Sequence, residues 1–495
     1  MKKTIILFSI LAFTFVAACK KSKTDDPIVT PTSNVVEVSG DIKVNTTWTS
    51  DKIYLLKGFV YVTDNATLTI QPGTIIKGDK ITKGSLIITR GSKISAIGTS
   101  TNPIVFTSNF PIGSRTQGDW GGIILLGKAP VNQTGGEVVI EGGLLPTSGG
   151  LASKYTTYGG TDAADNSGTM KYVRIEYAGV PFVTNNEINS LTMGGVGSGT
   201  TLEYIQVYRA GDDAFEWFGG TVNAKYLLAI GTWDDDFDTD FGYVGKVQFA
   251  LAQRVKEIAD VSGSNGFESD NDAAGTAGTP KTSPIFSNVT IVGPQATATT
   301  TSGMNANFQH AAQIRRNSAM SLFNSILGNY IEGIYIDDNL PASGNKSSSN
   351  YTAGSLVIKN NLIYGSNTKY NVTTAPNNGQ IKGKDATSKL VFEAGLTADN
   401  SFVPGTSVST LLTSGFAFGA EFVASGVATP NFTAVAAGAA ASGALFTDAK
   451  FTGDTFFDKT VAFKGAFGTT DWSAGWAMYD PSTLNYTTPG RVMTN

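Results

Sequence analysis

Apolar and polar residues alternate over short stretches of this chain, and glycine separates one stretch from the next. The segments 66–78 and 84–96 show the pattern most clearly, because the second repeats the apolar and glycine positions of the first. The matching pairs are Leu68 with Leu86, Ile70 with Ile88, Gly73 with Gly91 and Ile76 with Ile94. Alternation with a period of two predicts short β-strands, and the glycines predict tight turns. A unit this small cannot bury its own apolar face, so it forms a core only by stacking on its neighbours.

Acidic segments extend the repeat. Asp212–Phe218 is followed by the similar segment Asp234–Asp240, and the related segment 266–270 comes next once an insertion is allowed. One coil for every stretch of about 18 to 30 residues predicts an all-β fold, a right-handed parallel β-helix. A β-propeller needs about 40 to 50 residues for each blade, and a pair of β-sandwiches would lack so short a repeat. The solenoid is therefore the favoured fold.

The N-terminus predicts export. Two lysines precede the apolar run 5–15, and Val-Ala-Ala leads into Cys19, the only cysteine of the chain. This pattern predicts a signal peptide over residues 1–18, and the small residues before Cys19 resemble the lipobox of bacterial lipoproteins. Lipidation of Cys19 is expected, and an ordinary secretory signal is the alternative. The polar residues that follow, up to 37, are expected to form a flexible tether.

The remaining chain divides into a β-helix over 38–388 and C-terminal coils with an irregular, partly helical cap over 389–495. The cap is expected because the last coil of a solenoid otherwise offers an open edge. Trp472, Trp476 and Tyr479 near the end are expected to pack back on the helix.

Composition removes several functional classes. The 36 Lys and Arg residues are balanced by 40 Asp and Glu residues without any long basic block, so nucleic acid is not an expected partner. One cysteine and one histidine exclude an intrachain disulfide and Cys₄ or Cys₂His₂ zinc sites. His310 falls in a loop-like insertion, 295–310, and is expected to be an inert surface residue.

Strand alternation predicts which side chains of the acidic repeat point outward. If the phenylalanines at 215, 237 and 267 point into the core, the residues beside them point outward. Two outward rows are predicted: Glu216, Asp238 and Glu268 in the first, and Phe218, Asp240 and Asp270 in the second, which continues as Arg315 and Asp337. Stacked carboxylates about 4.8 Å apart repel one another and have raised pKa values unless a cation intervenes.

Calcium is the cation expected at these rows, because it binds several carboxylate oxygens at about 2.3 to 2.6 Å and tolerates irregular geometry. The predicted ligands are the acidic members of the two rows: Glu216, Asp238, Asp240, Glu268 and Asp270.

Several segments carry a family resemblance. The stretches LTIQPGTIIKG, GSLIITRGSKISAIGT and GDWGGIILLGKAP resemble the opening coils of pectate-lyase-like β-helix proteins. From about residue 40 to the end, with GDDAFEWFGG and TWDDDFDTDFG, the chain resembles a family of exported β-helix lipoproteins of Bacteroidota. The resemblance implies the fold and an outer-membrane location, lipid-anchored through Cys19 and facing the cell surface. It implies no established activity.

Three functions remain open. The first is a binding or adhesion scaffold for a polysaccharide or a cell-surface protein, assisted by calcium, with Phe218, Trp233 and Tyr335 as stacking platforms. The second is a polysaccharide lyase or glycoside hydrolase that uses Glu216, Asp238, Glu268 or Arg315. The third is a purely structural protein, in which the aspartates serve only tight turns. A binding scaffold is favoured, because an arginine base stays protonated.

One structural feature separates these functions. Catalysis requires the acidic row to be recessed between loops, with at least one displaced pKa, whereas a binding face can be flat and fully solvated.

Overall fold

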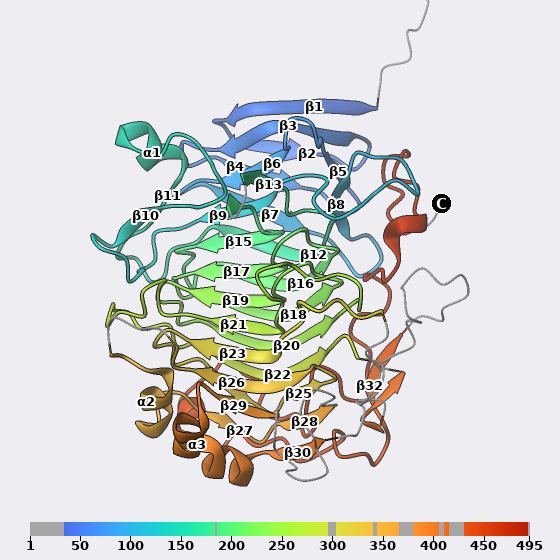
Figure 1. The fold of residues 1–495 in the computed structure, drawn as a ribbon. Helices are drawn as coiled ribbons and strands as arrows, with labels where there is room; N and C mark the ends of the chain where they lie inside the picture. Colours follow the sequence, from blue (N-terminus) through green and yellow to red (C-terminus); the bar gives the residue numbers. More distant parts are fainter. Residues whose placement is uncertain are drawn as a thin grey trace, which may run out of the picture. The chain divides into compact units, whose positions relative to one another are not determined.

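Parallel strands stack in three columns and form the body of the protein (Figure 1). The computed structural model describes residues 34–183, 186–295, 303–339, 344–365, 380–404, 410–414 and 430–493. The contacts within 34–495 make this part of the chain one unit. Cys19, the predicted signal peptide and most of the predicted tether lie outside the described residues.

Several long strands bend at a corner and contribute to two columns. The first column consists of β1 (Val35–Ile42), β3 (Ile53–Val62), β5 (Ile75–Gly78), β8 (Ile104–Ser108), β12 (Gly168–Glu176), β16 (Thr201–Tyr208), β18 (Asn223–Ile230), β20 (Lys246–Gln253), β22 (Ile285–Val292), β25 (Ile326–Gly328), β28 (Leu362–Gly365) and β30 (Ser401–Pro404). The third column consists of β2 (Thr46–Trp48), β4 (Thr67–Ile70), β7 (Lys93–Ile97), the first halves of β12, β16, β18, β20 and β22, then β24 (Ser321–Phe323) and β27 (Ile358–Lys359).

The second column carries the acidic rows. It consists of the ends of β1 and β3, then β6 (Ser85–Ile88), β9 (Gly122–Leu126), β15 (Leu191–Gly194), β17 (Phe215–Phe218), β19 (Phe237–Asp240), β21 (Phe267–Ser269), β23 (His310–Arg315), β26 (Glu332–Asp337) and β29 (Ile381–Gly383). All 26 strands of the three columns belong to one sheet system, which confirms the predicted parallel β-helix.

Shorter elements decorate the coils. They are the antiparallel pairs β10 (Glu137–Val139) with β11 (Thr157–Gly159), β13 (Pro181–Val183) with β14 (Asn186–Glu187) and β31 (Leu412–Ser414) with β32 (Asn431–Ala434), the helices α1 (Gly149–Tyr155), α2 (Ser347–Thr352) and α3 (Ala386–Asp399), and the 3₁₀ turns η2 (Ala449–Phe451) and η3 (Pro481–Thr483). None of the described helices combines the length and apolar character needed to cross a bilayer.

The core follows from the repeat. Phe215, Phe237 and Phe267 occupy the same register in consecutive coils and are fully buried. Their ring centroids lie 5.8 and 5.4 Å apart, so the rings form a continuous ladder inside the helix. Stacked aromatic pairs contribute about 0.5 to 1.5 kcal/mol beyond the burial of their area.

Replacing Phe237 with leucine is expected to lower the free energy of unfolding by about 2 kcal/mol, because the ladder loses its middle ring and a cavity remains. Urea unfolding measures the effect. Ile97→Val is the matched control, since Ile97 lies on a strand but is 46% exposed, and its effect is expected below about 0.5 kcal/mol. Equal decreases in the free energy of unfolding for the two variants would show that the phenylalanine ladder does not contribute to stability.

A left-handed backbone residue forms the corner between the third and first columns. The residues at this corner, with φ between 51° and 62°, are Tyr172, Tyr204, Tyr226, Phe249, Asn288, Asn324 and Asn360. Aromatic residues rarely adopt positive φ, whereas asparagine does so readily. In the first coils the rings stack, with centroids 4.4 Å apart for Tyr172 and Tyr204 and 4.3 Å for Tyr204 and Tyr226. Stacking therefore stabilises a backbone conformation that is otherwise unfavourable.

The C-terminal strap, residues 440–493, runs back along this corner from the last coils to the first (Figure 1). Corner side chains bind its backbone: Asn360 donates to Gly443, Asn324 to Leu445 and Asn288 to Phe463, at 2.7, 3.0 and 2.8 Å. Farther along, Trp472 and Trp476 meet the tyrosine ladder edge-on, and Trp476 is fully buried. The terminal aromatics thus pack on the helix, as their position predicts.

The far end of the helix is closed by α3. Asp385 caps this helix, because its side chain accepts a hydrogen bond from the backbone N–H of Ser388 at 2.8 Å. Phe392 and Leu396 on its inner face are fully buried in the main core. The prediction of a partly helical C-terminal cap is confirmed, and its helix begins at Ala386.

Candidate functional site

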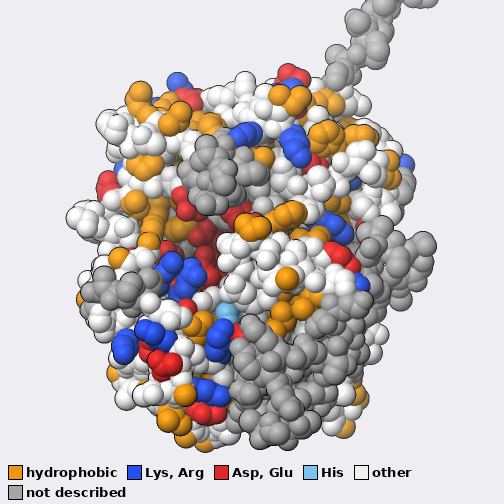
Figure 2. Space-filling model, viewed as in Figure 1, with side chains coloured by type: hydrophobic (Ala, Val, Ile, Leu, Met, Phe, Trp, Pro, Cys, Tyr) orange, Lys and Arg blue, Asp and Glu red, His pale blue; other side chains and the backbone are white. Residues whose placement is uncertain are grey.

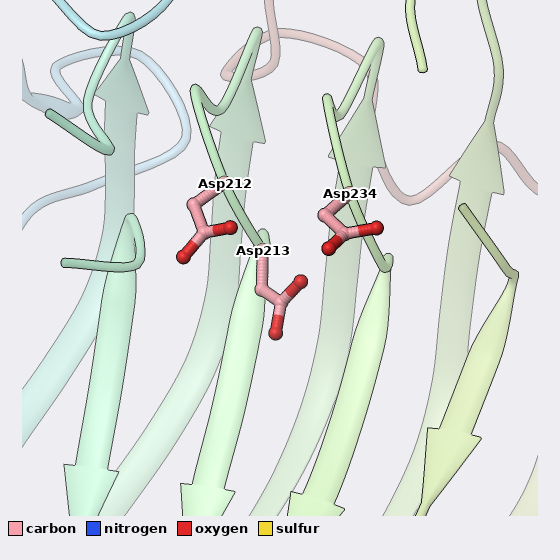
Figure 3. A group of neighbouring side chains, drawn as sticks. All are labelled: Asp212, Asp213 and Asp234. Atoms are coloured by element: carbon pink, nitrogen blue, oxygen red, sulfur yellow. The ribbon is translucent and has the colours of Figure 1, made fainter. Parts of the chain in front are cut away.

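Seven carboxylates gather where three strands of the second column begin. They form three overlapping groups whose oxygens lie within 4.8 Å of one another: Asp212, Asp213 and Asp234; Asp213, Glu216 and Asp238; and Asp235, Asp238 and Glu268. We refer to these seven residues as the carboxylate cluster. Figure 3 shows its first group, with Asp212 and Asp213 on the turn before β17 and Asp234 on the matching turn of the next coil.

Strand register and turn geometry together build the cluster. Glu216, Asp238 and Glu268 are direct neighbours in the parallel ladder of β17, β19 and β21. The turns before β17 and β19 supply the other four members one coil apart. These turns are bonded to each other, since the backbone N–H of Asp235 donates to Asp213 at 2.8 Å. The seven carboxylates are therefore held by regular backbone structure.

The cluster lies at the bottom of a cleft. Its carboxylates line a cavity of about 190 Å³, which shares Glu141, Asp212, Asp234, Ser262 and Arg315 with a larger cavity of about 970 Å³. Figure 2 shows the acidic side chains gathered in a hollow of the surface, next to lysine and arginine side chains. The acidic row is thus recessed.

The rim of the larger cavity is partly apolar. Val261 is 86% exposed, and Trp233 is half-buried beside it. The indole N–H of Trp233 donates to Asp260 at 2.8 Å, and Asp260 in turn accepts from Ser262. These bonds fix the plane of the indole ring at the cleft. Of the three predicted stacking platforms, Trp233 is the one that the cavity exposes.

Burial shifts the acidity of the cluster. Loss of hydration, followed by repulsion from neighbouring carboxylates, raises the pKa values of Asp213, Glu216, Asp235 and Asp238 far above their ordinary range. Burial raises the pKa of Asp234 to about 6. The pKa of Glu268 rises to about 7 by burial, although Arg315 opposes the shift.

Asp238 occupies the centre of the cluster. It belongs to two of the three groups, and its Oδ1 atom is shielded from solvent without a hydrogen-bond partner among the described residues. Asp234 Oδ1 is shielded and unpartnered in the same way, although its Oδ2 accepts from the Ser262 hydroxyl at 2.7 Å. Glu216 accepts from the Asn189 amide. A shielded, unpartnered carboxylate oxygen is costly, and a bound cation would compensate it.

Arg315 is a clamp for the acidic rows. Its Nε donates to Asp270 at 2.8 Å and its Nη2 donates to Glu268. Although burial lowers the Arg315 pKa, these two carboxylates raise it above its ordinary value. Both carboxylates stabilise the protonated guanidinium, which argues against Arg315 as a proton-abstracting base, and its catalytic use stays a prediction.

The second outward row departs from its predicted function. Phe218 points away from the core but is only 3% exposed, because Tyr158 and Phe241 cover it, so it cannot stack on a ligand. Asp240 lies outside the three carboxylate groups, and its Oδ1 accepts from the neighbouring backbone N–H of Phe241 at 2.6 Å. Asp270 is also outside the groups and pairs with arginine. Their assignment as cation ligands stays a prediction, and the three carboxylate groups do not include them.

Tyr335 and His310 also differ from expectation. Tyr335 is 4% exposed and packs against His310, with ring centroids 4.9 Å apart, so it is not a stacking platform. His310 is the first residue of β23 and is 3% exposed. Its Nδ1 lies 2.9 Å from Asn265 Oδ1 and its Nε2 lies 2.7 Å from Glu332 Oε2. The histidine is therefore buried, contrary to the surface loop that was predicted.

Sequence reasoning missed four members of the cluster. The sequence assigned turn positions to these four residues, Asp212, Asp213, Asp234 and Asp235. In the structure they occupy turns and also line the smaller cavity. A signal was present, because each Asp-Asp pair stands at the same distance before a core phenylalanine in consecutive coils. Glu141 carries no such signal, since the segment between β9 and β12 is not periodic.

Fold and site together define a right-handed parallel β-helix with a recessed row of carboxylates on one lateral sheet. The family model described as "Pectate-lyase like beta helix domain" matches residues 40–404, so the chain belongs to this family. No curated protein and no solved structure matches the chain significantly. Family membership indicates a polysaccharide-related role.

Proposed function

We propose that this protein binds a polysaccharide in the cleft with the help of a calcium ion held by the carboxylate cluster. The observation that carries the proposal is the position of Asp238, whose shielded Oδ1 lacks a partner among the described residues at the centre of two carboxylate groups. A cation there would neutralise charges that burial otherwise makes unfavourable.

The spacing of the oxygens suits calcium. Two oxygens bound to the same calcium ion at about 2.4 Å are at most about 4.8 Å apart, and the oxygens within each carboxylate group satisfy this limit. Asp235, Asp238 and Glu268 would supply ligands from two turns of the solenoid. Magnesium fits less well, because it requires a nearly ideal octahedron at shorter distances.

The larger cavity suits a sugar chain. Ligand clefts of several hundred Å³ that combine an aromatic face with polar groups are typical binding sites, and this one places Trp233 beside Asp212 and Asp234. The fixed indole ring would stack on a sugar ring. The expected lipid anchor at Cys19 would display this cleft at the outer membrane, facing the cell surface.

Calorimetric titration of calcium into the chain from Lys23 to Asn495 tests the cation site. This chain keeps the whole unit that begins at Asn34. We expect binding heat in the wild type and none in the Asp238→Asn, Glu268→Gln double variant, because two central ligands lose their charge. Glu203→Gln is the control, since Glu203 lies in the third column and pairs with Lys171. Absence of heat in the wild type, or unchanged heat in the double variant, would refute the site.

Cleavage of the bound polysaccharide is the second candidate function, and the recess of the cluster favours it. A carboxyl group whose pKa is about 7 is partly protonated at neutral pH and suits a general acid, so Glu268 is the residue to test. Release of new reducing ends by the wild type without formation of an unsaturated sugar, abolished in Glu268→Gln, would establish hydrolysis, whereas an unsaturated product would indicate a lyase. An unchanged polymer would leave binding as the function of the cleft.

A further inference from the structure

Asn265 lies two residues before β21 and is fully buried beside the carboxylate cluster. Its backbone N–H donates to Asp235. Its side-chain Nδ2 donates to the Gly263 carbonyl at 3.1 Å and lies 3.5 Å from Glu268 Oε2. Asp235 and Glu268 belong to the same carboxylate group. The geometry of that group therefore depends on how Asn265 is held.

His310 holds the other end of the Asn265 amide. The backbone N–H of His310 donates to Asn265 Oδ1 at 3.1 Å, and the ring atom Nδ1 lies 2.9 Å from the same oxygen. Because the backbone N–H fixes this amide atom as an acceptor, Nδ1 must carry a hydrogen and donate it. Two hydrogen bonds from one residue thus set the orientation of the Asn265 side chain.

Side chains from two neighbouring coils fix the opposite side of the imidazole ring. Glu332 on β26 is 2% exposed, and its Oε2 lies 2.7 Å from His310 Nε2. Lys382 on β29 donates to the same oxygen at 2.7 Å. Tyr335, also on β26, packs its ring against the imidazole. The imidazole is therefore held in one orientation from both of its nitrogens and from its face.

These contacts also assign the hydrogens of the ring. Since Nδ1 already carries one, the contact of Nε2 with a carboxylate requires a second, and the Lys382 ammonium group keeps Glu332 ionised. The geometry is that of an imidazolium. Burial lowers the pKa of His310, although its bond to Glu332 and the charge of Asp337 oppose the shift. When Nε2 loses its hydrogen, Lys382 Nζ at 3.4 Å is the donor left to it, so Nδ1 keeps its hydrogen in both states.

We propose that His310 is a positioning residue for the carboxylate cluster: it holds Asn265 through Nδ1–H, and Asn265 holds Asp235 and Glu268 in place for a cation. This inference rests on the proposed function. His310 itself is 3% exposed and belongs to none of the three carboxylate groups, so it acts only through Asn265. Residues that orient metal ligands without touching the metal commonly change its affinity by about 10- to 100-fold.

Two substitutions of His310 separate its two ring nitrogens. In His310→Asn the side-chain amide nitrogen replaces Nδ1 and can still donate to Asn265, whereas in His310→Gln it replaces Nε2 and reaches only Glu332. In calcium titrations of the chain from Lys23 to Asn495, we expect His310→Gln to weaken binding by at least about tenfold and His310→Asn to retain most of the affinity. Urea unfolding of both variants provides the matched comparison of stability, since each removes the ring and keeps one amide donor.

Nuclear magnetic resonance tests the hydrogen positions without calcium. His310 is the only histidine of the chain, so a protein made without a histidine tag and labelled with ¹⁵N in histidine gives the signals of one ring. We expect Nδ1 to carry a hydrogen at every pH and Nε2 to gain one on acidification, with a pKa below the ordinary value. Glu332→Gln should lower this pKa further, because the carboxylate stabilises the imidazolium.

Three results would overturn the inference. They are a neutral ring with its hydrogen on Nε2, undiminished calcium affinity in His310→Gln, and equal losses of affinity in the two His310 variants. Each of them rejects the positioning by His310 while leaving the cation site intact if the wild type binds calcium. Absence of calcium heat in the wild type rejects the proposed function itself, and the use of His310 for a cation site with it.

Discussion

As the pH falls from about 8 to about 5, the calcium-free protein is expected to become more stable and the calcium-loaded protein less stable. In the fold, burial raises the pKa of Asp234 to about 6 and the pKa of Glu268 to about 7. The folded chain therefore binds more protons than the unfolded chain between about pH 4 and pH 7. The stabilisation is complete below the unfolded pKa values and is lost as the pH rises through the folded ones.

The expected size of this effect between pH 8 and pH 5 is on the order of 3 kcal/mol for these two groups, since one pKa unit corresponds to about 1.4 kcal/mol and solvent reduces the effect at partly exposed carboxylates. Calcium reverses the direction, because it binds only the ionised carboxylates and competes with protons. Urea unfolding across this pH range, with a chelator or with excess calcium, measures both curves. In the Asp234→Asn, Glu268→Gln variant the free energy of unfolding should depend less on pH in both conditions, because these two groups no longer titrate. Parallel curves with and without calcium would contradict the coupling.

Removal of the C-terminal strap is expected to destabilise the protein by more than about 5 kcal/mol, because the strap buries Trp476, Tyr486 and Phe467 almost completely and each such aromatic side chain contributes about 1.5 to 3 kcal/mol. It also covers the buried pair of Arg174 and Glu176, since Arg174 donates to the Tyr486 hydroxyl and Tyr486 donates to Glu176, at 2.8 and 2.9 Å. Without the strap, the ion pair of Arg174 and Glu176 would lose its hydrogen bonds to Tyr486 and remain partly buried, which is unfavourable.

A chain that ends after Ala439 tests this expectation, with urea unfolding and dye binding to exposed apolar surface as measurements. Trp476→Ala is a milder variant, expected to cost about 3 to 5 kcal/mol. Leu445→Ala is the control on the same strap, because Leu445 is 53% exposed and its loss should change stability by less than about 0.5 kcal/mol. A shortened chain with the urea midpoint of the full chain would show that the strap contributes nothing.

The fold could be predicted because each coil repeats the same short pattern. Phe215, Phe237 and Phe267 recur at the same step before an acidic residue, and the parallel ladder preserves that register in space. The row of Glu216, Asp238 and Glu268 could be predicted for the same reason. The corner residues were also accessible in principle, since Tyr172 and Tyr204 stand at equivalent positions of successive strands.

The walls of the cleft could not be predicted, because they come from insertions without a period. Phe218 lies outward as alternation requires, but the segment that contains Tyr158 folds over it. His310 follows such an insertion, and it is buried by pairing with Glu332 on the next coil.

The strap also changes how the solenoid loses its structure. In a solenoid whose coils touch only their neighbours, stability is a sum of coil and nearest-neighbour contributions, so the coils can unfold one after another from either end. Here the strap joins the two ends: Asn360 near the last coils holds Gly443, and Arg174 in an early coil holds Val492. Unfolding should consequently be cooperative over the whole stack. A coil could be gained or lost only together with a matching change in strap length.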